Sequence, residues 1–115
     1  MGDVEIDLNG GRAWILYGVF RTRPDMIETL RAEMRKLAST PAIAVRSPAP
    51  GVAAPSWLVT GATASVGATV VAFGEKNVGI IVETTRRKAK SGDTPGALAL
   101  ARVATRHLRA VERAR

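Results

Sequence analysis

At 115 residues, of which 46% are hydrophobic, the chain is expected to form one globular domain that spans residues 1–115. The absence of cysteine excludes disulfide bonds, thiolate metal sites and a cysteine nucleophile. The net charge of +7 comes entirely from residues 86–115, because eight basic and eight acidic side chains cancel in residues 1–85. No apolar run reaches the ~18 residues that a membrane span requires, so no span is expected.

The first predicted element is a β-hairpin. Apolar side chains alternate with acidic ones along the first strand, and Asn9-Gly10 is the strongest short signal for a tight turn between strands. The returning strand, residues 12–20, places Trp14 and Leu16 on one face and its odd-numbered apolar residues on the other. A strand this close to an acidic N-terminus does not fit a signal peptide. We therefore expect a soluble, cytoplasmic protein, unless an upstream leader is missing from this chain.

A helix is predicted next. Pro24 and Asp25 fit its first turn, where proline loses no hydrogen bond and a carboxylate complements the helix dipole. Thr40-Pro41 ends it, because the residue before a proline disfavours the helical conformation. The apolar residues that recur at helical spacing are Ile27, Leu30, Met34 and Leu37. This stripe predicts that one side of the helix packs on a sheet.

Residues 41–56 carry four prolines and are predicted to form a long loop, in which residues 43–45 could be a short strand. Loops of this length are often functional or flexible, and a plain connection is the alternative. Residues 57–60 are predicted to form a short strand, and the small residues 61–67 a turn.

The centre of the fold is predicted to be a second hairpin. Two β-branched runs, residues 69–73 and 78–84, flank a short polar loop. We place Phe73 opposite Val78. Because both faces of this hairpin are apolar, it must be covered on both faces or lie centrally in a sheet.

A basic linker, residues 86–92, leads to a final helix capped by Asp93 or Thr94. Its inward stripe is predicted to be Ala97, Ala101, Ala104, Leu108 and Val111, with arginines on the opposite side. The elements together predict an α+β fold, ββα-βββα, in which a mainly antiparallel sheet is packed by two helices.

Residues 58–67, LVTGATASVG, resemble the phosphate-binding opening of short-chain dehydrogenases, a strand followed by TGxxGxxG and a helix. Gly61 and Gly67 match that pattern, whereas Ala64 replaces its middle glycine. The resemblance implies a dinucleotide site at a helix N-terminus. The β-branched run that follows favours a strand over a helix. We therefore interpret the match as coincidental and expect no cofactor, with a dinucleotide-binding remnant as an alternative.

No reaction can be assigned to this sequence. His107 is the single histidine and has no carboxylate within reach along its helix, and no serine stands in a nucleophile-elbow pattern. Clustered metal ligands are also lacking, so we expect neither an enzyme nor a metal site.

The basic C-terminus supports a second hypothesis, nucleic-acid or anionic-surface binding. The candidate polyanion-binding residues are Arg86, Arg87, Lys88, Lys90, Arg102, Arg106, Arg109 and Arg113. The alternative is that arginines on an exposed helix face serve solubility.

Residues 57–112, an apolar hairpin (VVAFGEKNVGIIVET) leading to an alanine-rich helix (ALALARVATRHL), resemble small α/β modules of bacterial lipoproteins and sensor ectodomains. The resemblance implies a non-catalytic binding or interaction module from an exported protein, with a protein partner or a second copy as its partner. The candidate loop site combines residues 46–56 with Trp57, Gly61, Ser65 and Gly67.

Overall fold

The structure is a computed structural model that describes residues 2–8 and 11–113, with side chains described for residues 11–111. Along these residues the chain forms strands and helices in the order ββαββββα. The elements are β1 (Gly2–Leu8), β2 (Gly11–Val19), α1 (Arg23–Ala38), β3 (Ile43–Arg46), β4 (Ser56–Ala62), β5 (Val66–Glu75), β6 (Val78–Arg87) and α2 (Thr94–Arg113).

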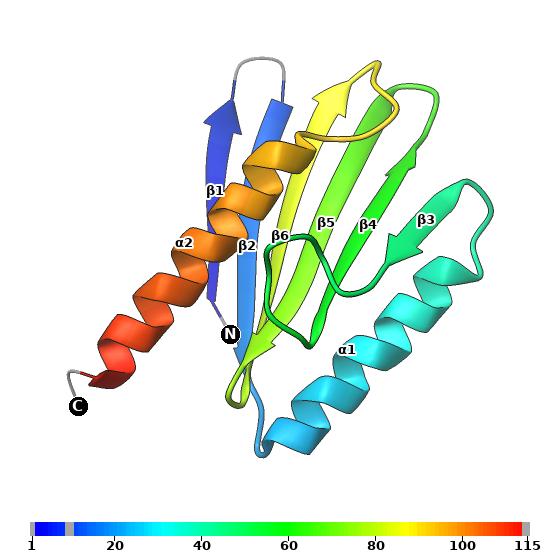
Figure 1. Ribbon diagram of the computed structural model, residues 1–115. Coiled ribbons are helices and arrows are strands. Elements are labelled where there is room, and N and C mark those ends of the chain that lie inside the picture. The colour runs from blue at the N-terminus through cyan, green and yellow to red at the C-terminus, as the bar shows by residue number, and fades with distance from the viewer. Residues whose placement is uncertain (1, 9–10, 114–115) are drawn as a thin grey trace.

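The strands form one antiparallel sheet in the order β1-β2-β6-β5-β4-β3 (Figure 1). The predicted α+β class is therefore confirmed, and the hairpin β5–β6 lies centrally, as its two apolar faces require. The segment 43–46, which the sequence leaves open between loop and strand, is the edge strand β3. The first hairpin is also confirmed in its two strands, whereas its turn, Asn9-Gly10, lies outside the described residues.

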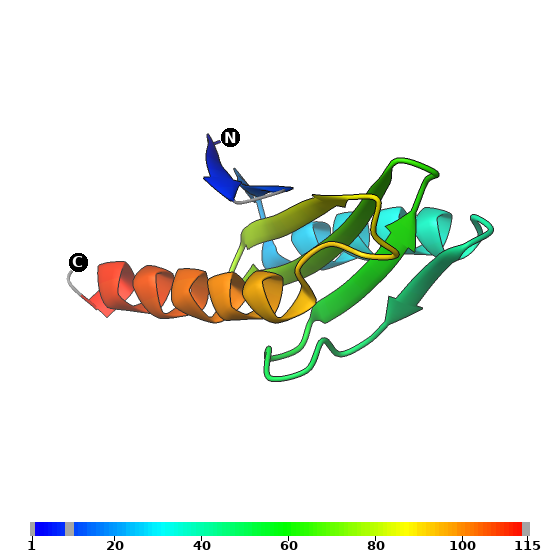
Figure 2. The same ribbon diagram turned by 90° about the horizontal axis from the view of Figure 1, so that it is seen from above.

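Two helices cover opposite faces of this sheet, as Figure 2 shows. On the face called here the α2 face, Val71, Phe73 and Ile80 pack with Ala97 and Ala101 of α2, and all of them are buried. On the other, the α1 face, Trp57, Val59 and Ala72 pack with the buried residues of α1, which are Met26, Leu30 and Met34. The central hairpin is thus covered on both sides.

The register of the central hairpin corrects our expectation. Phe73 pairs with Ile80 rather than with Val78, because the strands continue to Glu75 and turn through Lys76 and Asn77 alone. Lys76 takes the left-handed conformation that such a tight turn needs, with φ at +53°. The shift is two residues, an even number, so each side chain keeps the face that the sequence predicts.

The buried stripe of α1 differs slightly from the apolar stripe that the sequence predicts. Met26 is completely buried, whereas Ile27 and Leu37 are half-buried. Met26 packs against Gly74 and Gly79, which pair with each other across β5 and β6. A Cβ on Gly74 would overlap the Met26 Sδ, so the missing side chain makes room for the first turn of α1.

Helix α2 is capped by Asp93, whose Oδ1 accepts the Gly96 N–H at 2.9 Å. Its inward stripe is confirmed at Ala97 and Ala101 but wrong at Val111, which is 43% exposed. The last turns of α2 run past the sheet in Figures 1 and 2.

The loop between β3 and β4 is anchored on the α2 face, where Ala49 and Val52 are buried in the core. Ser56, fully buried, holds it: the Ser56 Oγ accepts the Ala49 N–H at 2.9 Å and donates to the Val52 carbonyl at 3.1 Å. This part of the proline-rich segment is therefore an ordered loop that packs on the core.

Replacing Ser56 by alanine is expected to destabilise the protein by about 1–3 kcal/mol, because it leaves a buried N–H and a buried carbonyl without their partner. Chemical denaturation measures the loss, and hydrogen exchange at the Ala49 amide should accelerate. Ser47→Ala is the matched control, since the exposed Ser47 hydroxyl donates to the Ser56 carbonyl at 2.7 Å and water can replace it. Equal losses in both variants would contradict this role of Ser56.

Candidate functional site

The structure separates the predicted polyanion-binding residues into two groups. Arg86 and Arg87 end β6, and Lys88 and Lys90 follow in the linker, beside the N-terminal end of α2. The arginines of α2 begin only at Arg102, and Arg106 lies ~18 Å along the helix axis from Thr94 at 1.5 Å per residue. One continuous basic stripe is therefore not formed.

The α2 arginines at positions 102, 106 and 109 are all exposed, as the sequence predicts, but they lie beside the proline-rich loop rather than away from it. Arg109 forms an ion pair with Glu75 of β5, with its Nε 3.2 Å from Oε1. Arg113 ends α2, and its side chain lies outside the described part of the chain.

The predicted loop site is not brought together as one surface. Trp57 is 8% exposed and lies under α1, whereas the loop that precedes it packs on the α2 face. Gly67 is buried against the backbone of the linker, and the Ser65 carbonyl accepts the Lys88 N–H at 2.8 Å. Gly61 lines a hollow on the α1 face, whereas residues 51–53 of the loop line a different pocket on the α2 face.

In the TGxxGxxG-like segment, Gly61 lies in β4, Ala64 in the turn after it and Gly67 at the start of β5. Residues 66–75 form a strand, so no helix N-terminus follows Gly67. A phosphate bound at such a loop depends on the N–H groups of that helix. The segment therefore serves as a strand connection in this fold.

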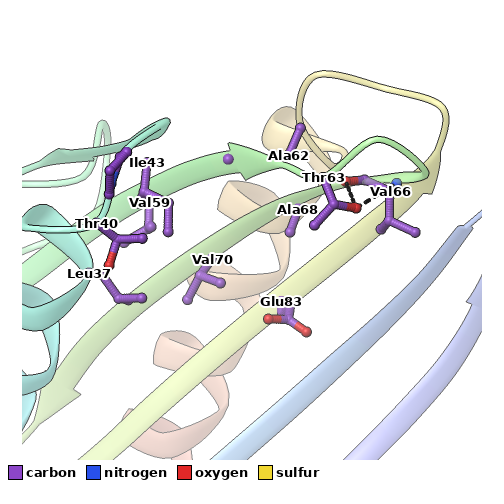
Figure 3. Close-up of a pocket in the computed structure, with 12 residues that line it drawn as sticks. Leu37, Thr40, Ile43, Val59, Ala62, Thr63, Val66, Ala68, Val70 and Glu83 are labelled. Atoms are coloured by element: carbon purple, nitrogen blue, oxygen red, sulfur yellow. Dashed lines mark hydrogen bonds between the residues drawn. The ribbon is translucent and has the colours of Figure 1, made fainter.

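A hollow of about 490 Å³ opens on the α1 face, beyond the C-terminal end of α1 (Figure 3). Its walls are mainly apolar and come from the helix end and from four neighbouring strands, β3 to β6. They include Leu37 and Thr40 at the end of α1, Ile43 of β3, Val59 of β4, and Ala68 and Val70 of β5. Sites for small ligands typically have this size and this apolar lining.

Among the described side chains, Glu83 of β6 is the one charged group that lines this hollow. It is half-buried and, among the described residues, has no hydrogen-bond or ion-pair partner. Burial raises the pKa of its carboxyl group above the usual value. Arg12 of β2 pairs with Thr85, so it lies diagonally across from Glu83 rather than opposite it. The Arg12 side chain makes another interaction. Glu83 is therefore an unpaired, half-buried carboxylate in a central strand, a position where a charged group normally has a partner.

The apolar surface continues from the hollow onto β2. Trp14 pairs with Glu83 and Leu16 pairs with Ile81, so both lie on the α1 face beside the hollow. Leu16 is 38% exposed, because α1 packs mainly on β3, β5 and β6. The hollow and this strip form one surface, of which Glu83 is the polar centre.

Sequence reasoning missed Glu83. A signal was present: in the predicted strand 78–84, Glu83 shares its face with Gly79 and Ile81 and is the one charged residue there. What could not be read from the sequence is that α1 stops short of it, since the position of a helix on a sheet depends on packing.

Comparison with protein-family models, curated proteins and solved structures finds no significant match to this chain. Within residues 2–8 and 11–113, no three His, Asp or Glu side chains gather as metal ligands. Neither helix in the described chain is long and apolar enough to cross a membrane. The geometry around Glu83 is therefore the basis for a functional proposal.

Proposed function

We propose that the protein is a non-catalytic binding module whose ligand occupies the hollow on the α1 face and presents a cationic group to Glu83. The observation that carries this proposal is the half-buried, unpaired Glu83 carboxylate on an otherwise apolar surface. A natural fold gains no stability from such a group, because burial disfavours its charged form. A ligand that restores a partner to the carboxylate accounts for its presence.

The walls of the hollow define the rest of the ligand. Aliphatic side chains such as Val59, Val70 and Ile43 favour an apolar body, and burial of apolar surface supplies most of the affinity at such a site. Glu83 then sets orientation, because an ammonium group hydrogen-bonds a carboxylate more strongly in a partly dehydrated site than in water. The ligand class is therefore a small apolar amine.

Binding rather than turnover is proposed because Glu83 stands alone. A catalytic nucleophile is typically activated by an adjacent base within hydrogen-bonding reach. The two hydroxyl side chains that line the hollow, Thr40 and Thr63, come from different segments, the α1–β3 connection and the β4–β5 turn. The Thr63 hydroxyl accepts the Val66 N–H at 3.2 Å, which gives it a structural role in its own turn.

A series of three ligands with one carbon skeleton tests the proposal: 4-phenylbutylamine, 4-phenylbutanol and 4-phenylbutanoate. We expect the amine to bind best and the carboxylate worst, as measured by calorimetry at neutral pH, with amide shifts in NMR spectra at Val59, Val70 and Glu83. Three equal affinities would show binding by apolar contact alone. Preference for the carboxylate, or shifts elsewhere, would refute the assignment of the site.

A further inference from the structure

A second concave site lies on the opposite face, between α2 and the loop that Ser56 anchors. Its volume is about 260 Å³, and its walls are residues 51–53 on one side and Arg102, Thr105, Arg106 and Arg109 on the other. The loop wall is fixed, because Val52 is 8% exposed and packs in the core under α2. The exposed arginines therefore line a pocket whose opposite wall is rigid.

The Arg102 side chain is held against the loop. The Arg102 Nε donates to the Leu98 carbonyl at 3.3 Å, which holds the guanidinium over Gly51. A Cβ on Gly51 would come within 3.6 Å of the Arg102 Cζ, and Gly51 has φ at +71°, a conformation that favours glycine. The loop thus approaches Arg102 closely.

The charges in this pocket do not cancel. Glu75 pairs with Arg109, with Nε–Oε1 at 3.2 Å and Nη2–Oε2 at 3.4 Å, and neutralises one arginine. Arg106 has no ion-pair or hydrogen-bond partner among the described residues. Arg102 and Arg106, four residues apart on the helix, repel each other. Two positive charges therefore remain in one concavity.

We propose that this pocket binds a phosphate monoester group. Such a group carries nearly two negative charges at neutral pH, which matches the two unneutralised arginines. Guanidinium groups donate paired hydrogen bonds to phosphate oxygens, the geometry for which arginine is better suited than lysine. This site is independent of the amine hollow, which lies on the other face of the sheet.

A compact ligand fits the chain better than a nucleic acid does. Residues 91–101, between the linker and Arg102, contain no basic side chain, so the two basic groups do not form a continuous track for phosphates. Aromatic residues make up 4% of the chain, which leaves few platforms for stacked bases.

Titration of the full-length chain with phenyl phosphate, followed by NMR, tests this proposal. We expect amide shifts at residues 51–53 and 102–109, and at least about tenfold weaker binding in Arg106→Gln. Arg35→Gln removes the same charge from α1 on the opposite face and should change the affinity less than about twofold. Equal weakening in both variants, or shifts centred on residues 86–90, would overturn the proposal.

Two further probes identify the source of the phosphate. Vesicles that contain phosphatidic acid, bound in a manner sensitive to Arg106→Gln, would assign the monoester to a lipid headgroup, whereas binding of phenyl phosphate alone would assign it to a soluble metabolite. A single-stranded oligonucleotide that binds more tightly than phenyl phosphate, and depends on Arg86 and Arg87 instead of Arg106, would refute the pocket. Thermal melts of all variants at two salt concentrations check that each is folded.

Discussion

Replacing Glu83 by glutamine is expected to weaken binding of 4-phenylbutylamine by about ten- to hundredfold. The substitution keeps the size of the side chain and removes its charge, so the ammonium loses a charge-assisted hydrogen bond worth about 1.5–3 kcal/mol. Calorimetry at neutral pH measures the change. Glu75→Gln is the matched control, because Glu75 is paired with Arg109 on the other face and should leave amine binding unchanged.

The same substitution is expected to stabilise the ligand-free protein at neutral pH. Burial raises the pKa of Glu83, so the native state holds this proton more tightly than the unfolded chain does. The stability that proton binding provides is complete below the unfolded pKa and is lost as pH rises through the folded pKa. Glu83→Gln should therefore melt at a higher temperature than the parent at pH 7, and the difference should disappear near pH 3.5.

Opposite effects on stability and binding distinguish a binding residue from a structural one. Replacing a residue that supports the fold lowers both stability and binding. Replacing a residue that is retained for ligand contact often raises stability while it weakens binding. A parent protein that is more stable than Glu83→Gln at pH 7 would mean that the carboxylate has a stabilising partner in the native state. That result would remove the reason to place a cation there.

The arrangement of the sheet could be predicted from local patterns. Strands 69–73 and 78–84 are apolar on both faces, and the structure places them centrally between α1 and α2. The predicted pairing of Phe73 was wrong by two residues, because the length of a tight turn depends on whether Lys76 takes a left-handed conformation. Side-chain alternation fixes the faces of a strand but not its register.

What the sequence could not predict are contacts between distant segments. The fit of Met26 against Gly74 and Gly79 depends on where α1 crosses β5 and β6, and no periodicity encodes that crossing. Similarly, the stripe of α2 indicates which side faces inward but not that Val111 is exposed. Lengths of helices and strands follow local rules, whereas their overlap is decided by packing.

The two candidate sites could likewise be predicted from the sequence only in part. The arginines of α2 could be named from their spacing, yet the loop that makes a concavity with them is fixed by Ser56, which no sequence pattern singles out. Glu83 stands in a strand that reads as ordinary core, and its importance depends on the end of α1 nearby. Side chains that act through shape become visible only once the fold is known.

Gly67→Ala is expected to destabilise the protein by about 3 kcal/mol, the upper end of the cost of overfilling a packed core. A Cβ at this position would lie 2.5 Å from the Ser91 carbonyl oxygen and 2.6 Å from that of Ala89, so either β5 or the linker must move. The last glycine of the TGxxGxxG-like segment is thus required because backbone passes directly over it. Chemical denaturation measures the loss of stability.

Ala64→Gly supplies the contrast, because it completes the TGxxGxxG pattern at an exposed residue of the β4–β5 turn. We expect it to change stability by less than about 1 kcal/mol and to confer no binding of a dinucleotide in calorimetry, since a strand follows where the motif needs a helix N-terminus. If Gly67→Ala were as stable as the parent while dinucleotide bound to Ala64→Gly, this glycine would belong to a phosphate site. If stability falls and no dinucleotide binds, Gly67 is explained by the linker that covers it.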